Sequence, residues 1–225
     1  MRTLLIYKIL AELINTFIRI IRKVYLYIKK LVLVVKDHYY DKKLGIETSE
    51  SYFSFPDQAS SLYKDMHIHR PTSYDRVRRI IDYLKPGPED VFIDFGCGKG
   101  RVVFLAAIQR LKKVIGVELD KKLVDIAKEN LKNVRLNNTP VEIVTADAAV
   151  FDVTDGTILF LYDPFGPNTV KKVLDNIKNS LATNPRKIRI VYSDPVFQYL
   201  LDTEGWLVLE KRIENNEVSV WRNKK

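Results

Sequence analysis

The first 36 residues carry one continuous helical pattern of apolar and charged positions. Apolar side chains recur at alternating spacings of three and four residues in two neighbouring series, which begin at Leu4 and Ile6. Charged side chains, mostly Lys and Arg, occupy the remaining side. This periodicity predicts an amphipathic helix over residues 1–36 with a wide apolar face, about 50 Å long at ~1.5 Å per residue. Charges interrupt every apolar run well short of the ~18 residues that a membrane-spanning helix needs.

Three interpretations of this helix stay open. It can lie in a membrane surface, which suits the wide apolar face, the Lys/Arg stripe and the Tyr residues near the interface. It can mediate oligomerisation through heptads, although two full apolar series are wider than a dimer seam. It can also pack against the rest of the chain or serve as a targeting sequence, but a secretory signal is disfavoured because charges interrupt any apolar core. We expect the first, with a cytoplasmic protein bound peripherally to an anionic membrane.

Beyond this helix the pattern changes twice. Residues 37–71 lack long periodicity, and we expect them to form a linker and a lid over a binding site. From Ser73 onward, short apolar runs alternate with helical patterns. The expected helices are 73–84, 100–110, 121–133, 167–182 and 195–203, and the expected strands are 91–95, 113–118, 141–145, 157–162, 187–192, 206–213 and 217–223. Alternating helices and continuous apolar strands predict a mostly parallel sheet covered on both faces, and Asn215-Asn216 is typical of a hairpin turn between the last two strands.

The positive charge is concentrated in the N-terminal helix. The chain has a formal net charge of +9, and residues 1–36 hold eight Lys/Arg against one acid, which leaves +2 for residues 37–225. A nearly neutral body argues against nucleic acid as the partner, since nucleic-acid binding needs a basic footprint. Cys97 is the single cysteine, so the chain has no internal disulfide and no zinc-ligand cluster, and no metal is expected.

A glycine-rich turn between an apolar strand and an apolar helix carries the strongest chemical signal. Its sequence is Asp94-Phe95-Gly96-Cys97-Gly98-Lys99-Gly100. Glycines let the backbone approach a ligand closely, at the carboxyl end of the strand and the N-terminus of the next helix. Nicotinamide and flavin folds use G-x-G-x-x-G, whereas here the third glycine comes one residue early. The turn resembles the S-adenosylmethionine (SAM) motif of class I methyltransferases.

This resemblance covers roughly residues 72–223 and implies a fold and a cofactor. The fold is an α/β doubly wound, Rossmann-like sheet of seven mostly parallel strands in the order 3-2-1-4-5-7-6, so residues 72–225 would form the methyltransferase domain. The cofactor is SAM. By the same resemblance, Asp94 interacts with the amino-acid end of the cofactor, and Gly96, Gly98 and Gly100 allow the close approach.

The ends of the next two strands supply the remaining cofactor contacts. Glu118 ends the second strand, where a carboxylate can accept hydrogen bonds from both ribose hydroxyls, and its neighbour Leu119 is expected against the adenine. Asp120 is interpreted as the cap of the following helix. By the resemblance, Asp147 after the third strand accepts a bond from the adenine amino group, and Ala148 makes a backbone contact.

The fourth strand ends in Asp163-Pro164-Phe165, which is similar to the [DN]-P-P-[YF] motif of amino-group methyltransferases but is one residue short. The resemblance implies that Asp163 and Phe165 bind the target amine, with Pro164 beside them, and Asp163 can equally act as a base. Asp194, after the fifth strand, is expected to contact the substrate at the same sheet edge. Further candidates precede the first strand: Thr72 as a substrate contact, Tyr74 as a catalytic residue, and His67 and His69 as ordinary surface histidines.

The expected function is therefore SAM-dependent methyl transfer near a membrane surface. The glycine turn and the strand Gly116-Val117-Glu118-Leu119-Asp120 are also similar to those of non-SET protein-lysine methyltransferases, which favours an amine acceptor, above all a protein lysine. The alternatives are a hydroxyl of a membrane-associated lipid, quinone or glycan, and a non-catalytic membrane-tethered scaffold that retains the fold. The glycine spacing counts against a dehydrogenase.

Overall fold

The computed structural model describes residues 2–49, 70–136 and 138–224, with side chains from residue 12 onward. The chain divides into two compact units, Met1–Tyr40 and Asp41–Lys225. The predictions for residues 50–69, which include His67, His69 and the middle of the expected lid, lie outside the described residues.

The first unit is a single long helix, α1 (Arg2–Leu44), whose last residues belong to the second unit. It runs past the expected end at residue 36, because no glycine or proline interrupts the chain before Gly45. Gly45 takes a φ of 72°, and its N–H and that of Ile46 donate to the carbonyls of Lys42 and Asp41. This pair of bonds is a Schellman motif, which terminates the helix there.

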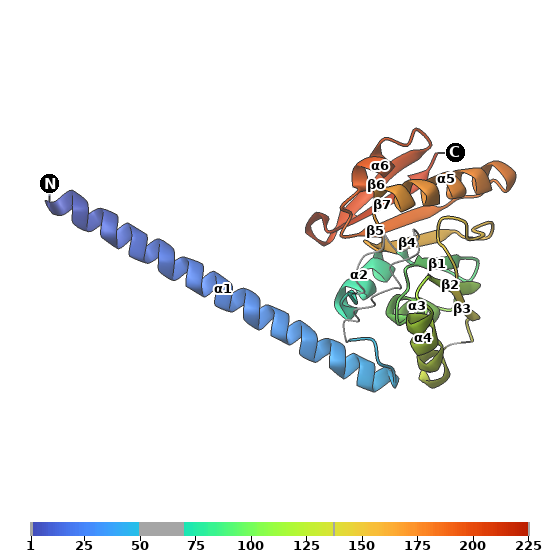
Figure 1. Cartoon of the computed structure of the whole chain (residues 1–225), viewed down its shortest axis with the longest axis horizontal. Helices are drawn as coiled ribbons and strands as arrows, with labels where there is room; N and C mark the ends of the chain where they lie inside the picture. The colour runs from blue at the N-terminus through green and yellow to red at the C-terminus, as the bar shows by residue number, and fades with distance from the viewer. Residues whose placement is uncertain (1, 50–69, 137, 225) are drawn as a thin grey trace, which may run out of the picture. The chain divides into compact units, whose positions relative to one another are not determined.

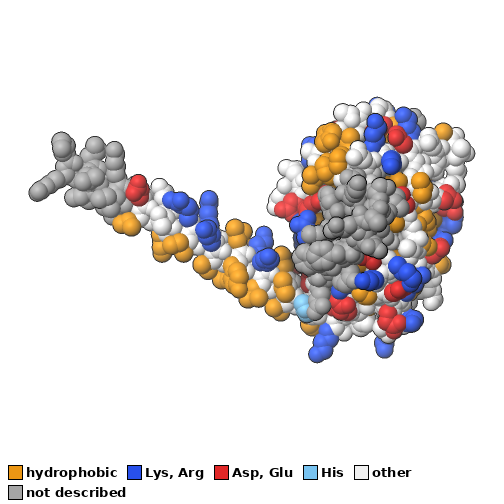
Figure 2. Space-filling model, in the orientation of Figure 1, with side chains coloured by type: hydrophobic (Ala, Val, Ile, Leu, Met, Phe, Trp, Pro, Cys, Tyr) orange, Lys and Arg blue, Asp and Glu red, His pale blue; other side chains and the backbone are white. Residues whose placement is uncertain are grey.

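Helix α1 exposes its apolar side chains. Phe17, Tyr25 and Tyr27 are each more than 60% exposed, and many other large apolar residues of the helix are exposed as well. Figure 2 shows the hydrophobic side chains gathered along one side of the helix and Lys and Arg along the other. None of the described helices is long and apolar enough to cross a membrane.

The second unit is built on one seven-stranded sheet with the order β3-β2-β1-β4-β5-β7-β6 (Figure 1). Its strands are β1 (Val91–Phe95), β2 (Lys113–Glu118), β3 (Val141–Thr145), β4 (Ile158–Tyr162), β5 (Arg189–Ser193), β6 (Leu207–Ile213) and β7 (Val218–Asn223). The helices are α2 (Tyr74–Leu84), α3 (Arg101–Ala107), α4 (Lys121–Asn133), α5 (Pro167–Thr183) and α6 (Gln198–Asp202). Strands β1 to β5 are parallel, and β7 is antiparallel to both β5 and β6. The predicted fold class and strand order are confirmed.

Side-chain alternation along the strands divides the core into two layers. On one face of the sheet, Gly116 of β2 lies against Val103 of α3, and a Cβ at Gly116 would come within 2.9 Å of that side chain. On the other face, Ile93 and Ile115 join a core cluster that includes the apolar side of α5. Helices therefore cover both faces, as the continuous apolar strands predict.

Local differences from the expected elements are confined to element ends. Helix α3 ends at Ala107 rather than at residue 110, and α6 covers only Gln198–Asp202 of the expected 195–203. Between β6 and β7, residues Glu214–Asn216 form a 3-10 turn. All three have positive φ, which Asn tolerates better than most residues, so the Asn pair supports this turn.

Candidate active site

The predicted site residues meet at one edge of the sheet. Because β1, β2, β3, β4 and β5 are parallel, their carboxyl ends lie together. Asp94 of β1 pairs in register with Gly116 of β2 and Phe160 of β4, and Glu118 ends β2. The acids after these strands and the glycine turn therefore share one edge, as the resemblance implies.

The glycine turn has the left-handed backbone that its sequence requires. The φ angles are 74° at Gly96, 53° at Gly98 and 93° at Gly100, a region that favours glycine. The N–H groups of Gly96 and Cys97 both donate to the carbonyl of Val117, which holds the turn against β2. A Cβ at Gly96 would lie 2.5 Å from Cβ of Pro164, so the turn directly adjoins the segment after β4. The predicted cofactor and acceptor regions are thus in contact.

Asp94 is buried without a hydrogen-bond donor among the described residues. Only 2% of the surface of this residue is exposed. Burial, together with the nearby charge of Glu118, raises the pKa of Asp94 well above its ordinary value. A buried carboxylate of this kind favours a cationic partner, and the ammonium at the amino-acid end of SAM is one.

Glu118 is also buried, but backbone donors hold its carboxylate in place. Oε1 accepts hydrogen bonds from the N–H groups of Leu119 and Asp120 at 2.8 and 2.9 Å, and Oε2 accepts one from Gly98 at 3.0 Å. Burial raises the pKa of Glu118, and these three bonds oppose that rise. Two carboxylate oxygens offer about four acceptor positions, so one position, on Oε2, remains for a ribose hydroxyl.

The neighbouring acids act in turns and caps. Asp120 Oδ1 accepts a bond from the N–H of Lys122 at 2.8 Å and caps α4, as expected. Asp147 lies after β3, half-buried, and its Oδ1 accepts a bond from the N–H of Ala149 at 2.9 Å. Leu119 is half-buried and Ala148 is buried. The adenine contacts of Leu119, Asp147 and Ala148 stay predictions.

After β4, Asp163 and Pro164 are half-buried, whereas Phe165 is only 6% exposed and belongs to the core cluster. Asp163 has a φ of 37°, which is strained for a residue other than glycine. The hydroxyl of Tyr192, a fully buried residue of β5, donates a long hydrogen bond of 3.5 Å to Oδ1 of Asp163. The roles of Asp163 and Phe165 toward an acceptor stay predictions.

Asp194 follows the adjacent strand β5 and shares the left-handed backbone, with a φ of 47°. It does not cap α6, which begins after Phe197. Its Oδ1 accepts a bond from Arg76 of α2 at 3.0 Å, and the same guanidinium also pairs with Glu217. Arg76 thus fixes a second carboxylate beside the end of β4, and the pattern of the sequence offered no sign of this long-range pair.

The segment before β1 is buried more deeply than a surface lid. Thr72 is 3% exposed and Tyr74 is 0% exposed. The Tyr74 hydroxyl donates to Oδ1 of Asp41 at 2.5 Å, and the guanidinium of Arg101 lies 4.4 Å from the centre of its ring. Burial and the bond to Asp41 raise the pKa of the Tyr74 hydroxyl. Asp41 and Arg101 are site neighbours that the sequence analysis did not identify.

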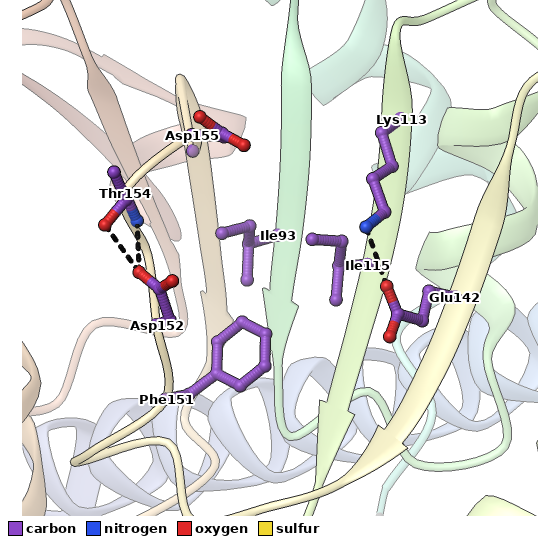
Figure 3. A pocket seen from close by; sticks show the side chains of 9 residues that line it. Ile93, Lys113, Ile115, Glu142, Phe151, Asp152, Thr154 and Asp155 are labelled. Atoms are coloured by element: carbon purple, nitrogen blue, oxygen red, sulfur yellow. Dashed lines mark hydrogen bonds and ion pairs between the residues drawn. The ribbon is translucent and has the colours of Figure 1, made fainter.

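A separate pocket lies away from this edge, as Figure 3 shows. Ile93 and Ile115 form the apolar middle of its lining. The ion pair of Lys113 with Glu142, at 2.7 Å, lies on one side of them, and the loop that contains Asp152 lies on the other. Lys113 begins β2 and Glu142 lies at the start of β3, so the pocket is toward the amino ends of the strands. It forms where a loop, rather than a helix, connects β3 to β4.

The residues at the carboxyl edge fit SAM. A buried carboxylate without a donor suits the ammonium, a second carboxylate with a spare acceptor position suits a ribose hydroxyl, and the glycine turn leaves space that a Cβ would fill. When bound, SAM supplies a methyl group on a positively charged sulfur, which makes that methyl group electrophilic.

Comparisons with known proteins agree with this assignment. A family model described as a methyltransferase domain matches residues 92–184. The chain is 30% identical over 95 residues to a protein named protein-lysine N-methyltransferase from Saccharolobus islandicus, which covers 41% of this chain and 57% of that protein. It is 33% identical over 145 residues to a histone-lysine N-methyltransferase, H3 lysine-79 specific, of Dictyostelium discoideum, covering 58% of this chain and 8% of that protein.

The fold is likewise similar to a solved structure of an RNA methyltransferase from Salinibacter ruber in complex with S-adenosyl-L-homocysteine. The TM-score is 0.51 at 25% identity, with 68% of this chain and 91% of that chain covered. The chain spans less than two thirds of the length of the curated relatives that head the comparison. The glycine turn, the strand order, the carboxylates and the comparisons agree: this chain is similar to class I SAM-dependent methyltransferases, and its residues 92–184 match a methyltransferase domain.

Proposed function

We propose that this protein transfers a methyl group from SAM to the side-chain amine of a protein lysine at an anionic membrane surface. One observation carries the choice of acceptor. Two carboxylates, Asp163 and Asp194, follow the adjacent strands β4 and β5. Pro164, the residue after Asp163, lies against Gly96 of the glycine turn. A cationic acceptor that reaches the cofactor there meets negative charge.

The proposed roles follow from the chemistry of an amine acceptor. A lysine arrives as an ammonium ion and must lose a proton before its nitrogen can attack a methyl group. The carboxylate of Asp163, which accepts a hydrogen bond from the Tyr192 hydroxyl, orients the ammonium and accepts that proton. Asp194, held by Arg76, adds a second attraction for the positive charge. The similarity to proteins named lysine methyltransferases supports the same acceptor.

The acceptor is tested with labelled SAM and lysine-containing proteins extracted from membranes. Label on lysine, located by mass spectrometry, supports the proposal, whereas label only in RNA or in the lipid fraction contradicts it. The Asp163→Asn variant should lose about 10²-fold or more in kcat, the usual range for a positioned proton acceptor. It should keep the SAM affinity of the unmodified protein, since Asp163 lies outside the groups proposed to hold the cofactor.

The membrane part of the proposal rests on α1. A helix with a wide exposed apolar face and a stripe of Lys and Arg is typical of helices that lie in a membrane interface. Each basic residue near an anionic surface contributes about 1 kcal/mol. Replacing Lys29 and Lys30 by Gln should therefore weaken binding by about 2 kcal/mol, or roughly 30-fold.

Flotation with lipid vesicles measures this effect. The full chain should float with vesicles that contain phosphatidylserine and much less with vesicles of phosphatidylcholine alone. The matched control replaces Lys121 and Lys132, two exposed lysines of the second unit, and should float like the unmodified chain. Equal flotation of both double variants contradicts the electrostatic attraction, and concentration-dependent self-association without vesicle binding supports oligomerisation through α1 instead.

A further inference from the structure

Residues 41–49, here called the strap, are tied to the start of α3 through a buried charge network. Asp41 is 6% exposed, and its carboxylate accepts four hydrogen bonds. Two come from Thr48, from its N–H at 2.7 Å and its hydroxyl at 2.6 Å. The others come from the N–H of Ser49 at 2.7 Å and the hydroxyl of Tyr74 at 2.5 Å. These bonds lower the pKa of Asp41 although burial opposes them, so the network holds a carboxylate anion.

Arg101 faces that carboxylate from the residue directly after Gly100. It is 3% exposed, and its Nε donates to the Thr48 hydroxyl at 2.8 Å. Its two terminal nitrogens donate to the carbonyl of Thr72 at 2.7 Å and to the Ser49 hydroxyl at 2.9 Å. The latter nitrogen lies 3.7 Å from Oδ1 of Asp41. A single guanidinium therefore joins the cofactor turn, the strap and the segment leading into α2.

A second link runs through Asn130 of α4. Its side-chain amide pairs with the backbone of Glu47, accepting from the N–H at 2.9 Å and donating to the carbonyl at 3.1 Å. The same amide donates to the carbonyl of Lys99, inside the glycine turn, at 3.1 Å. The Lys99 ammonium in turn pairs with the Glu47 carboxylate. The strap thus contacts Lys99 inside the glycine turn and Arg101 directly after it.

We propose that Asp41, Tyr74 and Arg101 are positioning residues that hold the strap and the Thr72 segment against the glycine turn and so preorganise the SAM site. This inference rests on the proposed use of SAM. The Thr72 hydroxyl is buried and unpartnered within the part of the chain that the structure describes, while its carbonyl is held by Arg101. A buried hydroxyl without a hydrogen-bond partner destabilises the fold, and a bound ligand that supplies the partner removes this cost. The Thr72 segment is therefore consistent with a segment held in place for a ligand.

Arginine geometry provides a sharp test. Lysine keeps the charge of Arg101 but cannot reproduce a fork that reaches Thr48, Thr72 and Ser49 at once. The matched control is Arg186→Lys, because the Arg186 guanidinium also binds backbone carbonyls, those of Gly156 and Val153 at 2.8 and 2.6 Å. Arg186 lies beside the loop before β4, at the opposite end of the strands.

Isothermal titration of SAM into the full chain and its variants tests the inference, with thermal unfolding measured in parallel. Arg101→Lys should raise the Kd for SAM at least tenfold, and amide hydrogen exchange in residues 95–101 should accelerate. Arg186→Lys should lower thermal stability to a similar extent and leave the Kd within twofold. Tyr74→Phe keeps the ring beneath Arg101 and removes only the hydroxyl bond to Asp41, so it should fold and bind SAM about threefold to tenfold more weakly.

The outcomes separate the two proposals. No SAM binding by the unmodified, folded chain overturns the proposed function and this inference with it. Binding by the unmodified chain, with Arg101→Lys and Tyr74→Phe equal to it, overturns the inference alone. Equal loss of SAM affinity in Arg101→Lys and Arg186→Lys also overturns it, since the network would then serve stability only.

Discussion

Glu118 is the residue whose replacement most directly tests the cofactor site. Three backbone N–H groups hold its carboxylate, two on Oε1 and one on Oε2. In Glu118→Gln, an oxygen placed at the Oε1 position keeps the bonds from Leu119 and Asp120. The amide NH₂ then faces the N–H of Gly98, so that bond is lost and one acceptor for a ribose hydroxyl is lost with it.

The magnitude follows from the bonds that change. A hydrogen bond to a charged group contributes about 1.5–3 kcal/mol, and about 1.4 kcal/mol corresponds to tenfold in affinity. Loss of the one charged ribose bond that the remaining position on Oε2 can accept should raise the Kd for SAM about 10- to 100-fold. Stability should change less, because burial already raises the pKa of Glu118 and a neutral side chain avoids that cost.

Calorimetric titration of SAM and S-adenosylhomocysteine measures this loss, and the control is Asp120→Asn. Asp120 is the neighbouring buried acid, and asparagine also caps helices well, so the control should keep the SAM affinity of the unmodified protein. The reasoning is refuted if Glu118→Gln binds SAM within threefold of the unmodified protein, or if Asp120→Asn loses as much affinity.

Two further substitutions probe the same edge. Gly96→Ala places a Cβ 2.5 Å from Cβ of Pro164 at a φ of 74°, and should cost about 2–5 kcal/mol from left-handed strain and overpacking, whereas Gly205→Ala, with open space around it, should leave Tm and SAM binding unchanged. Asp94→Asn removes a buried carboxyl group whose pKa is raised, so the Tm of the unliganded protein should rise, by about 2–4 °C per kcal/mol, while the affinity for SAM falls. The sign follows from linkage: the stability tied to protonated Asp94 is present at low pH and lost as pH rises through its raised pKa, so the gain in Tm should be large at pH 8 and shrink toward pH 4. A Tm gain independent of pH would contradict this cause.

The parts of the fold that follow local rules could be predicted from the sequence. The glycine turn needs positive φ, the apolar runs need burial on both faces, and the Asn pair before β7 suits a turn, so each appears as a short pattern. The order of the strands followed from the resemblance rather than from periodicity. The predicted end of α1 was wrong by eight residues, because the apolar pattern alone does not mark where a helix ends and the stop signal lies at Gly45.

The contacts that complete the site could not be predicted in this way. Arg76 and Asp194 are separated by 118 residues, and the Arg101 and Thr48 side chains by 53. Such pairs depend on which helix faces which strand end, and no spacing rule in the sequence encodes that. Phe165 shows the same limit: a motif places an aromatic ring after β4, but only tertiary packing decides that it enters the core.

The strap also bears on where the catalytic unit begins. The resemblance implies a methyltransferase domain from residue 72, and the second compact unit, Asp41–Lys225, contains the strap as well. A chain starting at residue 72 would leave Arg101 buried without the Asp41, Thr48 and Ser49 groups that it contacts. Removing the partner of a buried charge costs about 3–5 kcal/mol, a large share of the ~5–15 kcal/mol that typical domains have. Chains starting at residues 37 and 72 should therefore differ sharply in Tm and in SAM affinity, and equal values by thermal unfolding and titration would show that the strap is dispensable.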